Sequence, residues 1–171
     1  MTFKEKVDYF VKNHEKIDIA YMTVTTFLDE VCPQVEEQIY LKGFLTQDVS
    51  AGPLKEEMKK RSGNYPKTVF GSTETILSGL PSVEHPGSFF FDWRVTYHEF
   101  IPEDRAVDPD IVTLTEPPET VRMMDVEPGK RYQLVVTPLY IDLTRYVMPD
   151  IFECVSMGDD LLGSNTPVFK Y

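Results

Sequence analysis

The spacing of apolar residues predicts helices at the start of the chain. In residues 3–13 they recur three and four positions apart, with Lys and Glu between them, which is the pattern of an amphipathic helix. The same spacing over residues 24–31 predicts a second helix, and Pro33 ends it because proline has no backbone N–H to donate. Residues 35–39 predict a third, short helix with Gly43 as its terminator.

Three short runs in the same part of the chain predict strands, at residues 17–21, 44–46 and 67–70. The first of them is expected to be buried. Between the second and the third, Pro53 suits the first turn of another helix, which Gly63 ends. Helix and strand therefore alternate as far as residue 75, which is the pattern of a sheet covered by helices.

Strands dominate the rest of the chain. Strand-like runs follow at residues 89–91, 95–101 and 131–137, and a shorter one at 111–114 lies within an acidic, proline-bearing loop. Residues 143–150 are interpreted as a loop that follows a strand.

These patterns predict an α/β fold, with a mixed sheet flanked by helices followed by a strand-rich portion. The length suits one domain, so we expect residues 1–171 to form a single domain. Within it, a helix-and-strand part covers 1–75 and a strand-rich part covers 76–171.

Composition narrows the classes of partner. The net charge of −11 argues against a general binder of nucleic acid or of anionic membranes. No apolar run approaches the roughly 18 residues of a membrane helix. The two cysteines, Cys32 and Cys154, lack CxxC spacing, so a reducing cytoplasm is the expected location. The three histidines do not have metal-ligand spacing, and no zinc site is expected.

The first candidate for chemistry is the turn that follows the predicted strand 67–70. Gly71 lets a ligand approach the backbone, Ser72 and Thr73 can donate hydrogen bonds to phosphate oxygens, and Glu74 offers an oxygen ligand for Mg²⁺. The G-x-x-x-x-G-K-[ST] spacing of a P-loop does not occur in the chain. The alternative is an ordinary surface turn rich in Gly, Ser and Thr.

Two further carboxylates, Glu99 and Asp150, are candidate binding residues. Strand alternation places Glu99 on one face with Tyr97, among apolar neighbours. Glu99 is interpreted either as an edge carboxylate that faces solvent or pairs with Arg, or as a carboxylate of a substrate pocket. Asp150 is either a turn former or the kind of residue that holds both hydroxyls of a ribose.

Three blocks, in order, resemble the adenylate-forming superfamily, which includes acyl-CoA synthetases, phenylacetate-CoA ligase-like enzymes and the plant acyl-acid amido synthetases of the GH3 group. Residues 70–75 resemble its Y-G-S-T-E block, and residues 97–102 resemble Y-F-E-F-I-P. Residues 128–137 resemble G-x-x-Y-E-L-V-V-T, and residues 145–150 that follow them resemble R-Y-x-x-G-D. The resemblance implies that the chain is part of the large domain of such an enzyme.

The resemblance also implies roles for single residues. Phe70 would lie against the adenine, and Ser72 and Thr73 would contact phosphate oxygens, with Gly71 beside them. Glu74 would hold Mg²⁺ and, with Thr73, form the catalytic pair, while Asp150 would bind the ribose. The implied cofactors are ATP or AMP and Mg²⁺. The implied substrate is a small carboxylic acid, and the acceptor is CoA or an amine.

The chain departs from the family pattern in ways that keep the alternatives open. Pro149 replaces the Gly before the ribose-binding Asp, and Val147 stands where the family often has Arg. The family's N-terminal phosphate loop and C-terminal lid lysine have no counterpart in these residues, so the chain resembles the central portion and ends near the hinge. It could be a fragment, a subunit of a split enzyme or a relic.

Two functions follow as hypotheses, and whether the chain alone is an enzyme stays open between them. One is a partial acid–AMP ligase that binds ATP or AMP and a carboxylic acid. The other is a non-catalytic adenylation-like module with a binding or structural role. In either case we expect exposed apolar surface to favour a homo-oligomer or a partner chain that supplies the missing domains.

Overall fold

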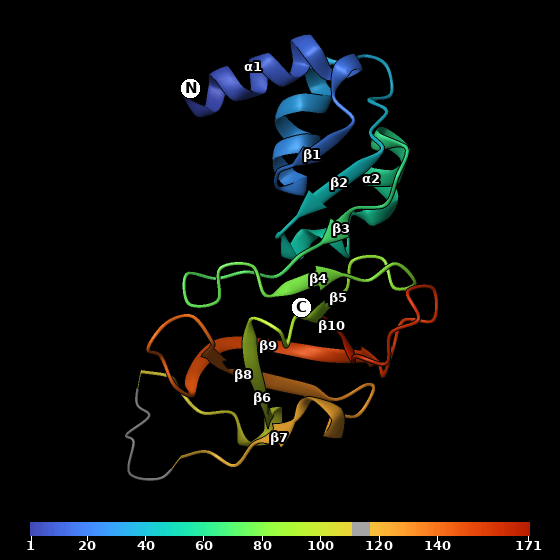
Figure 1. Cartoon of the computed structure of the whole chain (residues 1–171). Coiled ribbons are helices and arrows are strands. Elements are labelled where there is room, and N and C mark those ends of the chain that lie inside the picture. The colour runs from blue at the N-terminus through green and yellow to red at the C-terminus, as the bar shows by residue number, and fades with distance from the viewer. Residues whose placement is uncertain (111–116) are drawn as a thin grey trace. The chain divides into compact units, whose positions relative to one another are not determined.

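The computed structural model describes residues 1–110 and 117–171 (Figure 1). The strand predicted at 111–114 lies outside the described residues. The chain forms two compact units, Met1–Val69 and Phe70–Tyr171, and each has its own hydrophobic cluster. The single-domain organisation stays a prediction, and the division falls six residues before the boundary expected at residue 75.

The first unit alternates helices and short strands. Its elements are α1 (Phe3–Asn13), η1 (His14–Lys16), β1 (Ile19–Tyr21), η2 (Thr26–Val31), η3 (Cys32–Gln34), β2 (Gly43–Thr46), η4 (Val49–Ala51), α2 (Lys55–Ser62) and β3 (Lys67–Thr68). The helix predicted at 3–13 is confirmed. It begins with a capping box in which Thr2 and Glu5 satisfy each other's backbone N–H groups. The helix before Gly63 is also confirmed, and Gly63 ends it at φ 79°.

The strands of this unit form a parallel three-stranded sheet in the order β1-β2-β3. Strand β1 occupies one edge. Of its three residues only Ala20 is buried, so the expectation of a buried strand there was wrong. An edge strand covers the core with one face and turns the other to solvent.

The helix predicted from Val35 and Ile39 is not formed. The segment between Gln34 and Gly43 has no regular helix, and backbone N–H groups of Ile39 and Leu41 instead donate to the carbonyls of Arg61 and Ser62. Both side chains are fully buried. An apolar spacing of four residues suits an extended segment anchored to a neighbour as well as a helix, and here the tertiary hydrogen bonds decide between them.

The second unit is a seven-stranded antiparallel sheet. Its elements are β4 (Gly79–Pro81), β5 (Phe89–Phe91), β6 (Thr96–Pro102), η5 (Glu103–Arg105), β7 (Val121–Arg122), η6 (Met123–Asp125), β8 (Arg131–Pro138), β9 (Tyr146–Ser156) and β10 (Val168–Lys170). The strand order is β4-β5-β10-β9-β8-β6-β7, and β9 lies between β10 and β8 (Figure 1). The α/β fold with a strand-rich second portion is confirmed.

The largest difference from expectation is β9. Residues 143–150 were expected to form a loop, but β9 begins at Tyr146 and runs for 11 residues. Its pairing with β8 shifts register: Gln133 pairs with Ile151, whereas Val135 pairs with Val147. One residue of β8 therefore faces three residues of β9, which is a bulge at Met148–Asp150. Proline is tolerated at a bulge because no ladder N–H is needed there, and Pro149 concealed the strand in the sequence.

A buried carboxylate fixes the loop between β4 and β5 to the segment before β10. The Asp159 side chain is fully buried and accepts hydrogen bonds from the Ser82 hydroxyl at 2.7 Å and from the backbone N–H groups of Val83, Glu84 and Leu162. Burial by itself would raise the pKa of Asp159, but these donors lower it to about 2.

We expect Asp159→Ala to lower the free energy of unfolding of this unit by about 2–4 kcal/mol, because four donors lose their acceptor. Urea denaturation followed by the fluorescence of Trp93, the single tryptophan, measures it. The folded pKa is depressed from 3.8, so the stabilisation is present above pH 4 and disappears as the pH falls towards 2. The exposed neighbour offers the control Asp160→Ala, and equal effects of both variants would refute the role of Asp159.

Candidate functional site

The loop carrying residues 71–78 is closed at its base by a two-residue bridge. Phe70 and Gly79 exchange backbone hydrogen bonds at 3.2 and 2.9 Å. A Cβ on Gly79 would lie 2.4 Å from the Cβ of Phe70, so only glycine permits this approach. The loop therefore leaves and re-enters the sheet at a fixed place.

Hydrogen bonds within the loop set its shape. The Ser72 hydroxyl accepts the backbone N–H of Thr75 at 3.2 Å and lies 3.1 Å from the Thr75 hydroxyl. Thr73 is exposed, and Glu74 is half-buried. Ile76 adopts φ 54°, a left-handed conformation that is unfavourable for a β-branched residue. Such strain often accompanies a binding or catalytic loop, because the surrounding structure must hold it in place.

Asp150 lies on β9, at the edge of the bulge. The buried Gln133 side chain donates to the Met148 carbonyl at 2.9 Å, which holds the backbone of the bulge in place. The same amide nitrogen donates to the Val107 carbonyl at 2.8 Å. Strand alternation puts Asp150 on the side of Phe152. The ring of Phe152 packs against Phe70 with a centroid distance of 5.1 Å. This contact brings β9 to the base of the 71–78 loop.

The charge of Glu74 reaches Asp150 although 76 positions separate the two residues in sequence. Burial is the main cause that raises the pKa of Asp150, and the negative charge of Glu74 raises it further. Glu74 is therefore near enough for its charge to reach Asp150, which a shared nucleotide and metal site would require. Their roles in binding stay predictions.

Two tyrosines that no sequence pattern singles out belong to the same region. The Tyr140 hydroxyl donates to the Glu74 carbonyl at 3.4 Å. Tyr171 packs against Phe70 and Phe152 with centroid distances of 6.3 and 5.3 Å. Burial, and secondarily the charge of Asp150, raise the pKa of Tyr171 to about 12. A lone tyrosine carries no signal in a sequence, because only the fold brings it to the site.

The Phe70 ring lies in the core of the second unit. Its side chain is 2% exposed and is stacked on Phe89 at 5.7 Å, with Phe91 and Phe152 edge-on at 5.5 and 5.1 Å. An adenine ring would need a face that these rings cover. In this structure Phe70 anchors the loop to the core, and its contact with adenine stays a prediction.

Glu99 forms an ion pair, which is one of the two alternatives that the sequence left open. Its carboxylate accepts from the Arg145 guanidinium at 3.1 Å and from the Thr120 hydroxyl at 2.7 Å, and its side chain is 14% exposed. Arg145 itself adopts φ 50°. The ion pair thus connects residues 97–102 with residues 145–150, two segments that resemble family motifs. Tyr97, on the same strand face, is half exposed and lines a separate pocket; a substrate contact by Tyr97 or Glu99 stays a prediction.

The donor set suits Mg²⁺ only when a nucleotide supplies the remaining ligands. Within residues 1–110 and 117–171, no group of three or more His, Cys, Asp or Glu side chains could hold a metal ion. Mg²⁺ is commonly bound through one or two carboxylates together with phosphate oxygens and water, which is compatible with Glu74. None of the helices in those ranges is both long and apolar enough to cross a membrane.

Comparison with known proteins agrees with this architecture. Residues 89–169 match the GH3 family central domain. The solved structure of AtGH3.15 acyl acid amido synthetase in complex with 2,4-DB is similar, with a TM-score of 0.53 and 20% identity; the match covers 85% of this chain and 22% of that one. A second similar structure, GH3.15 acyl acid amido synthetase, has a TM-score of 0.52 and 19% identity. That match covers 85% of this chain and 23% of the other.

The chain therefore spans about a fifth to a quarter of the length of these solved proteins. At such low identity the structural likeness speaks for the fold alone. A comparison with curated proteins found no match. The family match covers strands β5 to β10, and it includes Asp150 but begins after Glu74. Residues 89–169 are thus similar to the GH3 family central domain, and the fold is shared with two GH3 acyl acid amido synthetases.

Proposed function

We propose that this chain forms the nucleotide-binding part of an acid–AMP ligase, which joins a small carboxylic acid to AMP. The observation that carries the proposal is the contact of Phe70 with Phe152, which brings β9 with Asp150 to the hydrogen-bonded 71–78 loop that contains Glu74. The match of residues 89–169 to the GH3 family central domain supports it. One of the similar solved structures is a complex with 2,4-DB, which supports a carboxylic acid as the substrate class here.

Each residue takes a role that its position allows. Ser72 and Thr73 would donate hydrogen bonds to phosphate oxygens, Glu74 would hold Mg²⁺ through an oxygen, and Asp150 would accept hydrogen bonds from the ribose hydroxyls. In the reaction a carboxylate oxygen of the acid attacks the α-phosphorus, and the bond to the pyrophosphate oxygen breaks. The hydroxyl donors would offset the negative charge that gathers on the phosphate, and Mg²⁺, when bound, would supply further charge stabilisation.

The alternative is a binding or structural module without catalysis. It is favoured by the Ser72 hydroxyl, which is engaged by Thr75 within the loop, and by the burial of Phe70. If these hydrogen bonds serve only to stabilise the loop conformation, no ligand is needed at Ser72. The experiments below separate the two functions.

The convergence of the two carboxylates is tested by titration. We expect NMR of the Asp150 carboxyl carbon to give a pKa above 3.8, and Glu74→Gln to bring it down, because one of the two causes of the raised pKa is removed. The matched control is Glu119→Gln, at an exposed carboxylate that pairs with Arg105. An Asp150 pKa that does not respond to Glu74→Gln would mean that the two side chains do not share a site.

Nucleotide binding is tested with Mg²⁺ and ATP on the 171-residue chain. We expect backbone NMR signals of residues 70–75 and of Asp150 to shift together on titration. Asp150→Ala should weaken the binding about tenfold or more, because charge-assisted hydrogen bonds to the ribose are lost. Asp160→Ala, at an exposed aspartate of the same unit, should leave the affinity unchanged. If neither segment responds to saturating nucleotide, the non-catalytic module is the better description.

Catalysis by these residues alone is a separate question. We expect no acid-dependent exchange of pyrophosphate into ATP from the 171-residue chain, because it covers only 22% of a related synthetase and the reaction needs groups from several parts of such an enzyme. Labelled pyrophosphate measures the exchange. Exchange that persists through purification and disappears in Glu74→Gln would show that the chain is a complete catalyst.

A further inference from the structure

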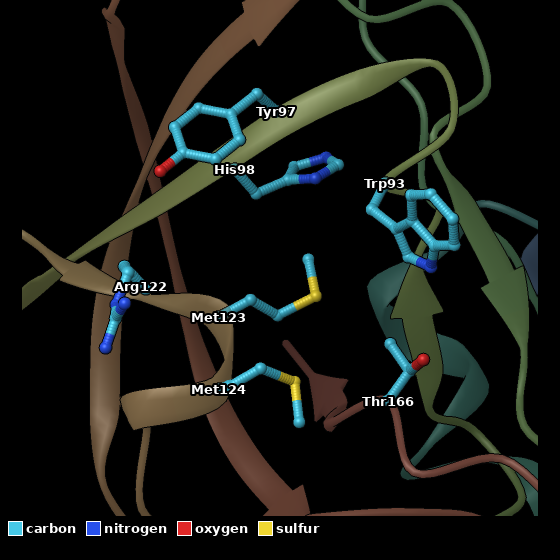
Figure 2. Close-up of a pocket in the computed structure, with 7 residues that line it drawn as sticks. All are labelled: Trp93, Tyr97, His98, Arg122, Met123, Met124 and Thr166. Carbon is cyan, nitrogen blue, oxygen red and sulfur yellow. The ribbon is translucent and has the colours of Figure 1, made fainter.

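A pocket in the Phe70–Tyr171 unit is lined by none of the residues assigned to the nucleotide. It has a volume of about 450 Å³, within the range of small-molecule sites. Its lining comes from three places in the sequence: Trp93 and His98 around the start of β6, Met123 and Met124 in η6, and Thr166 before β10 (Figure 2). The thioethers and the indole make this lining largely apolar.

His98 is the unusual group in the pocket. Its side chain is 2% exposed, and neither ring nitrogen has a hydrogen-bond partner among the residues described. Its ring packs near Phe91 at 4.7 Å between centroids, and Figure 2 shows the imidazole projecting into the space above Met123 and beside Trp93. Buried polar groups are normally paired, so a ring with two unpaired nitrogens at a pocket wall points to a partner outside the chain.

The Y-F-E-F-I-P block strengthens this reading. His98 stands at the position of the first Phe in that block. Packing alone would be served by phenylalanine, since His98 lies on the buried face of β6 between Thr96 and Phe100. The imidazole adds hydrogen-bonding atoms that the fold itself leaves unused.

Charge decides what kind of ligand fits. Burial lowers the pKa of His98 to about 3, although the charge of Asp92 opposes the shift, so the ring is neutral at pH 7 and offers one donor and one acceptor. The cation of the lining, Arg122, is paired with Asp125 at 2.7 Å. Asp92 is likewise paired with Arg94 at 2.8 Å, so a carboxylate would enter without a free cation in the pocket lining to balance it. A neutral hydroxyl group can both donate and accept at low cost.

We propose that this pocket binds a neutral aromatic compound carrying one hydroxyl group. The aromatic part lies against Trp93, Met123 and Met124, and the hydroxyl forms a hydrogen bond with His98. Thioether and indole groups favour such contact with aromatic rings. The ligand differs in charge from the carboxylic acid of the proposed reaction, and the pocket does not include Glu74 or Asp150.

The test uses the fluorescence of Trp93, which is the single tryptophan and lines the pocket. Para-phenylphenol is the probe, and para-phenylbenzoate has the same rings with a charged group. We expect saturable quenching by the phenol and an affinity at least about tenfold weaker for the benzoate. His98→Phe keeps an aromatic ring and removes both nitrogens, and it should weaken phenol binding about tenfold, as the loss of one hydrogen bond implies.

Matched controls keep the result specific. His85→Phe makes the same change at a partly exposed histidine that does not line the pocket, and it should leave the affinity unchanged. Absence of saturable quenching, equal binding of the two probes, or an unchanged affinity in His98→Phe would each overturn the proposal. Should His98→Phe not fold, the ring-nitrogen NMR signals of His98 in the unaltered chain replace it: a shift with the phenol supports the site, and no shift refutes it.

Discussion

The packing of Phe70 against Phe152 is the contact on which the candidate site depends. Phe70 begins the loop that carries Glu74, and Phe152 follows Asp150 by two residues on β9. A ring pair at 5.1 Å buries a large apolar area and allows few other arrangements of the two backbones. The acidic side chains are thereby held near each other by an apolar contact and not by any attraction of their own. The pKa of Asp150 is raised mainly by burial and, in smaller part, by the like charge of Glu74.

Regular periodicity made much of the fold predictable. The helix at 3–13 and the strand at 131–137 follow from it, whereas the next helix was predicted from Pro53 and Gly63 and the strand at 89–91 from a run of Phe. The failures occurred where tertiary hydrogen bonds or a bulge override local pattern. Val35 and Ile39 are as compatible with an extended segment as with a helix, and Pro149 makes a central strand look like a loop. Pairing partners such as Arg61 and Gln133 lie far away in sequence, so no local rule reveals them.

The candidate site was predictable only through residues whose chemistry is visible in the sequence. Glu74 and Asp150 were selected because carboxylates suit a metal and a ribose, and the structure brings their charges within influence of each other. Phe70 was assigned to a ligand because of its place in a motif, yet its ring is buried in the core. Tyr140 and Tyr171 reach the site only through folding. His98 did leave a signal, because a polar ring replaced phenylalanine in an otherwise similar block.

The difference between Phe70 and His98 shows why burial must be considered together with hydrogen bonding. Both rings are about 2% exposed and both pack against Phe91. Burial of Phe70 is favourable because its side chain has no polar atom, so packing in the core is enough to explain its position. Burial of His98 leaves two polar atoms without partners, which costs about 1–3 kcal/mol for each unsatisfied group. An apolar ring would avoid that cost, and a ligand hydroxyl in the adjoining pocket would offset it. The energetic argument thus favours a binding role at the histidine, and a structural role at the phenylalanine that the motif had assigned to a ligand.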